Sequence, residues 1–526
     1  MSRRPALAAL ALLVVAAAPL ASPAAGATSV AGIPAKLVGR HGPTAHYAQG
    51  LNLIGHTDLA RRKGGPALGN NGGIALIGNC AFVGRWHDYG DFRRNPGTVQ
   101  YPIQIVDVAK PSAPRVVGSV PNSNLLNAAA REIRAVDLPK FKMLVVQMFG
   151  KYLDEGATAP GQHSLYFYTF PSGRCTEPVL TGRIDLKPLR PHEFYLWLDP
   201  DPAHNVDGNP RVIAYVTAPL SGVDGAIVDA SKPAAPVLLG IWHGGQPLAS
   251  ATEENLAGDV PAGAGRYSHS IALSPDGRRA YVSQWDGGFL TLDASAIADA
   301  QPRATLGPLG AMSVPYLYET GAVGNTHSAV PMRGGETMVV GDEVYVTTDG
   351  CPYGWMRVID AGNQTAPPAQ IGEFRLRENR ADACSGVLSA SRNALGKSID
   401  GTFSMHNQTA TSRYALVSWY GGGLRVVDLA NPAKPRQTAF FVPKPPAKVL
   451  SVPDTSAPIF GATEDTSDDW WVSTWSYPIV RKGLIYVADI RGGLYILRAR
   501  PGTPLARDLA RYKFLEGNSN LDMFVR

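Results

Sequence analysis

One arrangement of apolar and polar positions returns along this chain. In its clearest form, at residues 404–435, a His-led segment precedes an apolar run that ends in glycines, a second run that ends in Asp, and a corner marked by prolines. The same order of features returns at residues 267–302. Short runs rich in Val, Ile, Leu and Tyr that end in turn residues are typical of β-strands. The sequence therefore predicts an all-β fold built from a repeated unit.

Two strands of this unit align in seven copies. The second strands are predicted to begin near residues 74, 142, 212, 279, 343, 413 and 484. Five of the third strands end in aspartate, at Asp107, Asp229, Asp293, Asp360 and Asp428. A carboxylate at this position can accept a hydrogen bond from the amide two residues on and fix the turn that follows. We therefore interpret these aspartates as structural and not as catalytic acids.

Fourth strands complete the unit in three copies, at Pro114–Val120, Pro236–Trp242 and Pro435–Val442. Seven four-stranded units predict a seven-bladed β-propeller of antiparallel blades. The last unit has no room for a fourth strand after Leu497, whereas residues 32–40 copy the fourth-strand sequence of residues 112–119. We therefore expect an N-terminal strand at 32–40 to complete the last blade and remove an exposed sheet edge.

Three units carry a sequence signature, in the stretches VDVAKPSAPRVVG, VDASKPAAPVLLG and VVDLANPAKPRQT. These stretches resemble the LVIVD repeats of exported bacterial proteins. The resemblance implies a propeller over most of the chain but implies little about activity, because the family is defined largely by its repeat. The units are spaced by about 70 residues, more than the roughly 40–50 usual for a propeller repeat. The excess is expected in loops, which often carry binding residues, and one helix is expected at Ala506–Phe514.

Residues 1–27 have the features of an export signal. Arg3 and Arg4 precede an apolar run at 6–20, and small residues lead to a cleavage site expected after Ala27. The run is too short to anchor the chain in a bilayer, and no later segment predicts a transmembrane helix. Export by the twin-arginine route and by the Sec route both stay open. We expect residues 28–526 to form a single propeller domain that is secreted to the cell exterior or the periplasm.

Charge and cysteine content bear on the class of binding partner and on the cellular compartment of the protein. Without Arg3 and Arg4 the formal net charge falls from +6 to +4, and no basic stripe with interleaved aromatic residues predicts nucleic-acid binding. Four cysteines without C-x-x-C spacing predict two disulfides in an exported chain. From their places in the units we expect the pairs Cys80–Cys175 and Cys351–Cys384.

The first strand of each unit begins with a residue that the repeat places at the same height along the propeller axis. These residues, which also mark where the blade cores begin, are His56, Arg131, His192, His269, His327, His406 and Trp475. Because the innermost strands surround the axis, they should form a ring near one mouth of the channel. Neutral imidazoles from a rigid frame are good ligands for Fe, Cu or Zn and leave a position for water or substrate.

The histidines permit two interpretations. As metal ligands, His192, His269, His327 and His406 would hold the ion, with His56 as a fifth ligand or a proton shuttle. As structural residues, each would bond a backbone carbonyl or the neighbouring blade. Arg131 and Trp475 break the symmetry of the ring and would suit an anionic or aromatic ligand. Glu132 and Glu193 follow ring positions and could serve as bases or support the ligands, if the strand does not turn them into the sheet.

Two functions of different class follow. In the first, an LVIVD-type propeller is a non-catalytic scaffold that binds an extracellular protein, glycan or small molecule, with Trp470 and Trp471 in a ligand-binding loop. In the second, it is a metal-dependent oxidoreductase whose site lies at the channel mouth and whose Arg131 holds a substrate carboxylate. Because no recognisable catalytic motif decides between them, the sequence leaves open whether the protein is an enzyme.

Overall fold

A computed structural model of the chain shows the fold. The residues it describes are 38–39, 42–43, 45–60, 71–85, 103–121, 128–138, 140–150, 163–218, 223–242, 267–285, 287–304, 316–318, 325–333, 336–344, 353–363, 367–379, 403–447 and 472–524. The expected export signal at 1–27 lies outside them. In the described part of the chain, no helix is long and apolar enough to cross a membrane.

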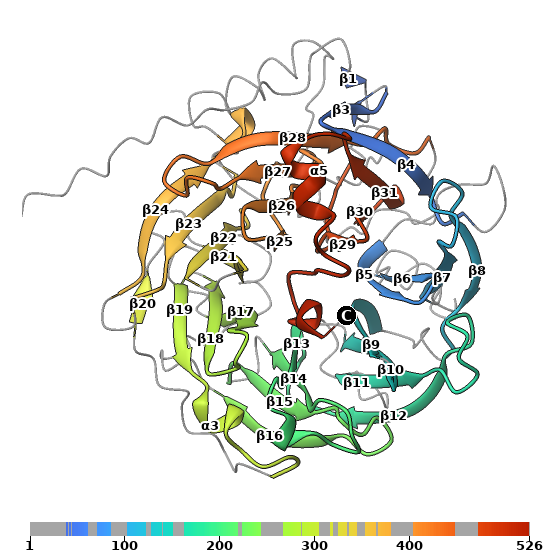
Figure 1. Cartoon of the computed structure of the whole chain (residues 1–526), viewed down its shortest axis with the longest axis vertical. Helices are drawn as coiled ribbons and strands as arrows, with labels where there is room; N and C mark the ends of the chain where they lie inside the picture. Colours follow the sequence, from blue (N-terminus) through green and yellow to red (C-terminus); the bar gives the residue numbers. More distant parts are fainter. Residues whose placement is uncertain are drawn as a thin grey trace, which may run out of the picture.

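The described strands form seven antiparallel four-stranded blades around a central axis, as the sequence predicted (Figure 1). Blade 1 contains β5 (Asn71–Ile77), β6 (Cys80–Arg85), β7 (Gln104–Asp107) and β8 (Arg115–Ser119). Blade 2 contains β9 (Ala128–Leu138), β10 (Phe141–Gly150), β11 (Ser164–Thr169) and β12 (Val179–Asp185). Blade 3 contains β13 (Phe194–Leu198), β14 (Val212–Thr217), β15 (Gly225–Asp229) and β16 (Val237–Trp242).

The remaining four blades follow the same order from the axis outward. Blade 4 contains β17 (Tyr267–Leu273), β18 (Arg279–Trp285), β19 (Gly288–Asp293) and β20 (Tyr316–Tyr318). Blade 5 contains β21 (Thr326–Pro331), β22 (Thr337–Asp342), β23 (Met356–Asp360) and β24 (Ala369–Phe374). Blade 6 contains β25 (Gln408–Ala410), β26 (Tyr414–Ser418), β27 (Leu424–Asp428) and β28 (Arg436–Val442), with β3 (Tyr47–Gln49) added outside. Blade 7 contains β29 (Ile479–Arg481), β30 (Leu484–Asp489) and β31 (Gly493–Ala499), completed by β4 (Leu51–Thr57).

Apolar side chains of facing sheets hold neighbouring blades together. A single buried cluster joins Val83 of blade 1, Val145 of blade 2, Leu196 of blade 3 and Ile496 of blade 7. Because burial of apolar side chains is the main favourable term in folding, these contacts between blades provide most of the stability of the ring.

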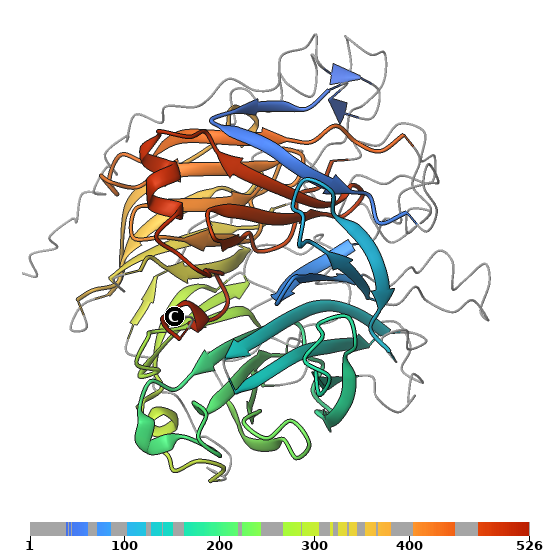
Figure 2. The same cartoon turned by 45° about the vertical axis from the view of Figure 1, so that its right-hand side comes forward.

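An N-terminal strand closes the ring, as expected, but it is β4 and not the segment 32–40. Leu51–Thr57 pairs with β31 as the outer strand of blade 7 (Figure 2). The described part of 32–40, β1 (Val38–Gly39), pairs with β2 (Gly42–Pro43). Residues 37–40 and 53–56 read LVGR and LIGH, so both carry an apolar pair followed by glycine, and the pattern alone does not separate them.

The assignment of strands in blade 1 also differs from the prediction. The segment 74–84, predicted as one second strand, is a hairpin made from the end of β5 and most of β6. The inner strand of blade 1 is therefore β5, and His56 lies in the outer strand of blade 7. There, its exposed side chain stacks on Tyr495 with ring centroids 4.2 Å apart, and its Nε2 donates to the Gly492 carbonyl at 2.7 Å.

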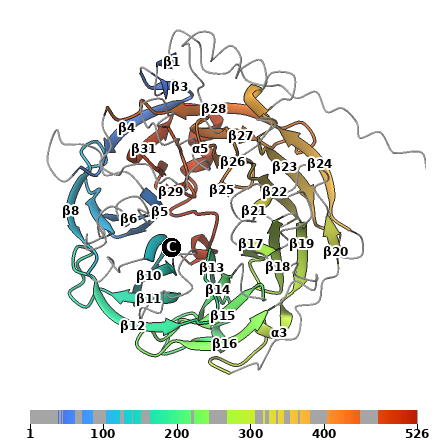
Figure 3. The ribbon, with the colours of Figure 1, turned by 180° about the vertical axis from the view of Figure 1, so that it is seen from behind.

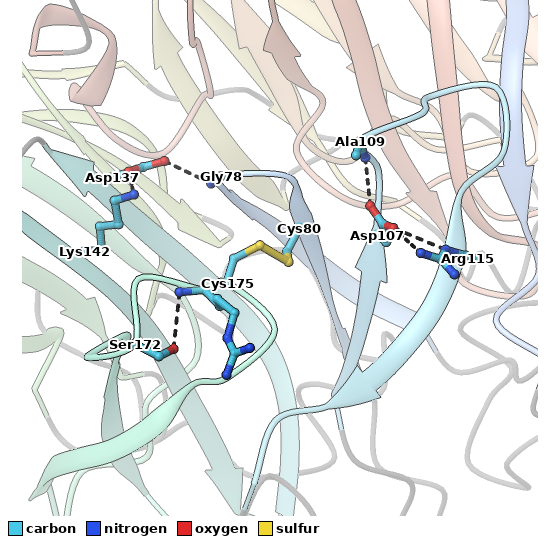
Figure 4. The surroundings of a disulfide bond; sticks show 10 residues. Gly78, Cys80, Asp107, Ala109, Arg115, Asp137, Lys142, Ser172 and Cys175 are labelled. Carbon is cyan, nitrogen blue, oxygen red and sulfur yellow. Dashed lines mark hydrogen bonds and ion pairs between the residues drawn. A yellow bond between two sulfur atoms is a disulfide. The ribbon is translucent and has the colours of Figure 1, made fainter.

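The disulfide Cys80–Cys175 is confirmed (Figure 4). It links β6 of blade 1 to the connection between β11 and β12 of blade 2. The bond closes a loop of 95 residues, for which the chain-entropy account gives a stabilisation of about 4–5 kcal/mol. Cys351 and Cys384 lie outside the described residues, so their pairing stays a prediction.

The C-terminal segment crosses the axis of the propeller. It follows α5 (Pro504–Leu509), which begins after the N-cap Thr503, two residues before the predicted helix. Residues 511–524, which include the short helix η5 (Leu521–Met523), lie in the middle of the ring when it is viewed from either side (Figures 1 and 3). Leu515 pairs with Val480 of blade 7, and Asn520 exchanges hydrogen bonds of 2.7 and 2.8 Å with Leu198 of blade 3. The channel is therefore crossed by the chain's own end.

Candidate metal centre

Four histidines stand at the start of consecutive inner strands. His269 lies in β17 and His327 in β21, while His192 and His406 each lie two residues before a strand, β13 and β25 respectively. The backbone carbonyl of each accepts a hydrogen bond of 2.5–2.8 Å from a polar side chain of the preceding blade, and these donors are Gln147, Thr217, Ser270 and Ser328. The repeated contact between blades fixes the four backbones at the same height.

The four imidazoles gather into one buried row. The ring centroids of His192 and His269 are 4.3 Å apart, those of His269 and His327 are 3.9 Å apart, and those of His327 and His406 are 4.2 Å apart. The most exposed of the four, His192, has a relative exposure of 8%. The structure thus brings together the four histidines that the repeat placed on successive blades.

The other predicted site residues have different positions. His56 is on the outer strand of blade 7, away from this row. Trp475 continues the row in blade 7, with its ring centroid 4.6 Å from that of His406. Arg131 has its backbone in β9, but its side chain lies outside the described residues, as do Trp470 and Trp471. Glu132 is buried in an ion pair of 2.8 Å with Arg134.

Glu343 joins this row, although it was not among the predicted site residues. The second strand of blade 5 was predicted to begin at Glu343, whereas β22 ends at Asp342. Both 337–342 (TMVVGD) and 343–350 (EVYVTTDG) have the composition of a strand, so hydrophobic pattern alone cannot choose between them. The apolar run 338–340, to which the predicted alignment assigned no strand, is the signal that was missed. A second strand placed on this run would have put Glu343 at its end.

The Glu343 carboxylate faces two imidazoles. Its Oε2 is 3.3 Å from His327 Nε2, and its Oε1 is 3.6 Å from His406 Nε2. His406 Nδ1 lies 2.8 Å from the carbonyl oxygen of Trp475, and because a carbonyl only accepts, Nδ1 carries the hydrogen. In the neutral imidazole, Nε2 then presents a lone pair to a carboxylate oxygen. Two acceptors that face one another in a buried site favour a cation between them.

Glu193 supports the other end of the row. Its Oε2 accepts a hydrogen bond from Tyr477 Oη at 3.2 Å and lies 2.8 Å from Ser270 Oγ. Ser270 Oγ directs its hydrogen at oxygen acceptors, so His269 Nδ1, 3.0 Å away, donates to it. His269 Nε2 is then left as an acceptor, 2.8 Å from His192 Nε2. A ligand histidine held through its other nitrogen in this way is typical of protein metal sites.

Two overlapping groups of side chains have the spacing needed to hold an ion. They are His327, Glu343 and His406, and Glu193, His269 and His327, and within each group the ligand atoms lie within 4.8 Å of one another. Nitrogen and carboxylate donors together suit Zn, Cu and Fe. Each group can therefore supply three ligands while the rigid inner strands hold the geometry.

Comparison with known protein families agrees with the repeat. The LVIVD repeat model matches residues 411–438, which include β26, β27 and part of β28. No curated protein matches the chain. Among solved structures, the Cps50 (Swd1) β-propeller domain of Myceliophteria thermophila is 11% identical and aligns over 82% of this chain and 98% of that chain, with a TM-score of 0.42. Sqt1 of Chaetomium thermophilum is 13% identical over 86% of this chain and 87% of that chain, with the same TM-score of 0.42.

Proposed function

We propose that this propeller binds a transition-metal ion at the row of histidines in its channel. The proposed ligands are His327, His406 and Glu343. The observation that carries the proposal is the pair of imidazole nitrogens that face the two oxygens of one buried carboxylate at 3.3 and 3.6 Å.

These two distances suit ligands of a shared ion better than an ion pair without metal. A charge-assisted hydrogen bond between an imidazolium and a carboxylate is about 2.7–2.9 Å long. Ligand atoms bound at about 2.0–2.2 Å in a tetrahedron are instead about 3.4 Å apart. The separations of His327 and His406 from Glu343 lie on either side of that value.

His192 has a supporting role in this proposal. Its Nε2 is 2.8 Å from His269 Nε2, which is a hydrogen-bond distance. Because one of the two nitrogens must carry the hydrogen, His269 accepts from His192 while no ion takes its lone pair. An ion held by His327, His406 and Glu343 would leave this hydrogen bond in place, with His192 and His269 beside the centre.

The carboxylates change the chemistry that the sequence predicted. Four neutral ligands would leave the full charge of the ion to attract an anionic substrate. Glu343 as a ligand and Glu193 beside His269 supply up to two negative charges, which offset a divalent ion. The charge of the metal ion therefore gives no reason to expect an anionic substrate. Carboxylates close to the ion also remove the sequence-based reason for preferring oxidoreduction over hydrolysis.

The alternative function, a scaffold that binds an extracellular protein, glycan or small molecule, shares the propeller and the LVIVD repeat. Its expected ligand-binding residues, Trp470 and Trp471, lie outside the described residues. No contact within the described residues favours it over metal binding, whereas Glu343 and the histidines support the metal.

Elemental analysis of the full chain, purified without an affinity tag and reloaded separately with Fe, Cu and Zn, tests the proposal. We expect about one equivalent of a transition metal in the wild-type protein and less than about a tenth in His327→Ala, His406→Ala and Glu343→Gln, because each loses a donor. His204→Ala is the matched control, since His204 is also buried and also bound to a carboxylate, Asp199 Oδ2, at 2.9 Å. Failure of all three metals to bind to the folded wild-type protein would refute the proposal.

A further inference from the structure

Tyr420 brings a phenol to the same carboxylate. Its Oη donates to Glu343 Oε1, the oxygen that faces His406 Nε2. The phenol ring is 1% exposed, and its centroid is 5.0 Å from that of His406. The phenolic oxygen therefore lies at the edge of the group formed by His327, Glu343 and His406.

The backbone holds Tyr420 at this place in an unfavourable conformation. Its φ of 31° falls in the left-handed region, which glycine adopts readily and a residue with a bulky side chain does not. The turn is fixed on both sides, because the Tyr420 carbonyl accepts from Gly423 N at 3.0 Å and from Thr474 N of blade 7 at 3.1 Å. Strained positions of this kind cluster at active sites and ligand clamps. Three glycines follow directly, yet the strained position carries a tyrosine whose side chain reaches the candidate centre.

From this geometry we infer that Tyr420 is a further ligand, bound through its phenolate oxygen, and that the centre takes Fe(III) or Cu(II). The inference rests on the proposed metal centre. When the ion binds, the phenolic O–H bond breaks, the oxygen keeps the electron pair and forms the bond to the metal, and the proton passes to the buffer. No electron is transferred in this step.

Charge and donor chemistry select the ion. Glu343 and a Tyr420 phenolate bring two negative charges to the side of the row that holds His327 and His406. Two anionic ligands neutralise Cu(II), and with the Glu193 carboxylate beside His269 the negative charge reaches the three units that Fe(III) carries, so that the buried charge of the ion is compensated. A phenolate is also an established protein ligand of iron. A centre of this composition suits ions that can change oxidation state, so this ligand would favour oxidoreduction.

The competing interpretation leaves Tyr420 protonated. In that case the phenol hydrogen-bonds Glu343 and orients it, without touching the ion. The two arrangements differ in one observable, since only a phenolate bound to Fe(III) or Cu(II) gives a phenolate-to-metal charge-transfer band in visible light and the matching tyrosinate vibrations in resonance Raman spectra.

The test loads the metal-depleted full chain with ferric citrate or Cu(II) and compares the wild type with Tyr420→Phe. Tyr477→Phe is the control, because Tyr477 is another buried tyrosine bonded to a carboxylate beside the row, Glu193, at 3.2 Å. We expect the band in the wild type and in Tyr477→Phe. Tyr420→Phe should lack it while still retaining the ion on its histidines, about 10–100-fold more weakly.

The possible outcomes separate the two proposals. A wild-type protein that holds a full equivalent of Fe(III) or Cu(II) without tyrosinate vibrations would overturn the role of Tyr420 and leave the metal centre in place. Persistence of those vibrations in Tyr420→Phe would also overturn it. A wild type that bound Zn but retained neither Fe(III) nor Cu(II) would reject the phenolate ligand alone, whereas failure to bind Fe, Cu or Zn would reject both proposals.

Discussion

Asp229 shows how a single side chain holds a blade corner. Its Oδ1 accepts from Ser231 N, two residues on, at 2.9 Å, and its Oδ2 accepts from Arg303 N at 3.1 Å. The other four third-strand aspartates accept the same bond from the residue two positions on, at 2.9–3.0 Å, and these residues are Asp107, Asp293, Asp360 and Asp428. The predicted structural role is confirmed for all five.

Replacement of Asp229 should therefore lower stability without affecting the candidate centre. We expect Asp229→Ala to reduce the free energy of unfolding by about 1–2 kcal/mol, because two partly buried amides lose their acceptor. Asp229→Asn keeps one acceptor oxygen and should cost less. Urea unfolding followed by tryptophan fluorescence measures the change. Loss of bound metal from folded Asp229→Ala, with an unchanged urea midpoint, would contradict the structural role.

The residues of the candidate centre were predictable only where the repeat specifies them. Each of the four histidines stands at the start of an inner strand. A position that recurs in every repeat therefore recurs in every blade around the axis, which is why His192, His269, His327 and His406 lie together. Glu343 and Tyr420 have no such counterpart in the predicted alignment, because each reaches the row from the end of a second strand. Their distance from the imidazoles depends on where β22 and β26 end, and apolar composition does not determine strand ends to one residue.

At the scale of elements, a glycine in the outer strand packs against the proline corner of the next blade. An added Cβ at Gly55 of β4 would lie 2.0 Å from the Pro111 carbonyl oxygen. The same clash, at 2.0 and 2.1 Å, would occur at Gly182 of β12 with Pro233 and at Gly372 of β24 with Pro432. Gly55 thus shows that β4 occupies a regular outer-strand position, and the close approach to Pro111 joins blade 7 to blade 1.

Gly55→Ala should weaken this closure. We expect a loss of about 1–3 kcal/mol in the free energy of unfolding, because the methyl group has no space beside the Pro111 carbonyl. Gly118→Ala is the matched control in the outer strand β8, where a Cβ would meet Ile105 at 4.0 Å, and its change should stay within about 0.5 kcal/mol. Thermal unfolding of both variants measures the difference. Equal melting temperatures would show that Gly55 does not limit the closure.

The order of strands was more predictable than their limits. The five third strands predicted to end in aspartate fall where the sequence placed them, because each ends at a corner that the aspartate marks. Blade 1 was misread where its first two strands form a tight hairpin through Gly78 and Asn79. A hairpin of two short apolar strands resembles one longer strand in hydrophobic pattern, and pairing between strands distant in sequence is what separates them.

At the scale of the whole molecule, the propeller encloses charged groups against its own C-terminal segment. Arg333, which follows the inner strand of blade 5, forms an ion pair of 2.9 Å with Asp522 and donates to the Glu516 carbonyl at 3.1 Å. Arg134 of blade 2 lies over the rings of Phe194 and Tyr477, with its guanidinium carbon 5.0 and 5.4 Å from their centroids. Arg333 ties the C-terminal segment to blade 5, and Leu515 and Asn520 tie it to blades 7 and 3, so the ionic state of the segment should affect the stability of the entire ring.

Glu516 makes that dependence measurable. Burial raises the pKa of its carboxyl from 4.5 to about 7, with Arg134 and Arg333 opposing the shift and Asp522 adding to it. Because the folded-state pKa is the higher one, the folded protein binds the extra proton between about pH 4.5 and 7, and stability falls as the pH rises through that window. A shift of this size corresponds to roughly 3 kcal/mol.

Glu516→Gln should remove this loss, because the amide stays neutral at every pH. We expect the variant and the wild type to have similar urea midpoints near pH 4.5, and the variant to become the more stable of the two by pH 8. Asp489, whose pKa burial raises to about 6, titrates in both proteins and largely cancels from the comparison. A difference between the two midpoints that stayed constant from pH 4.5 to 8 would show that Glu516 does not exchange its proton on unfolding.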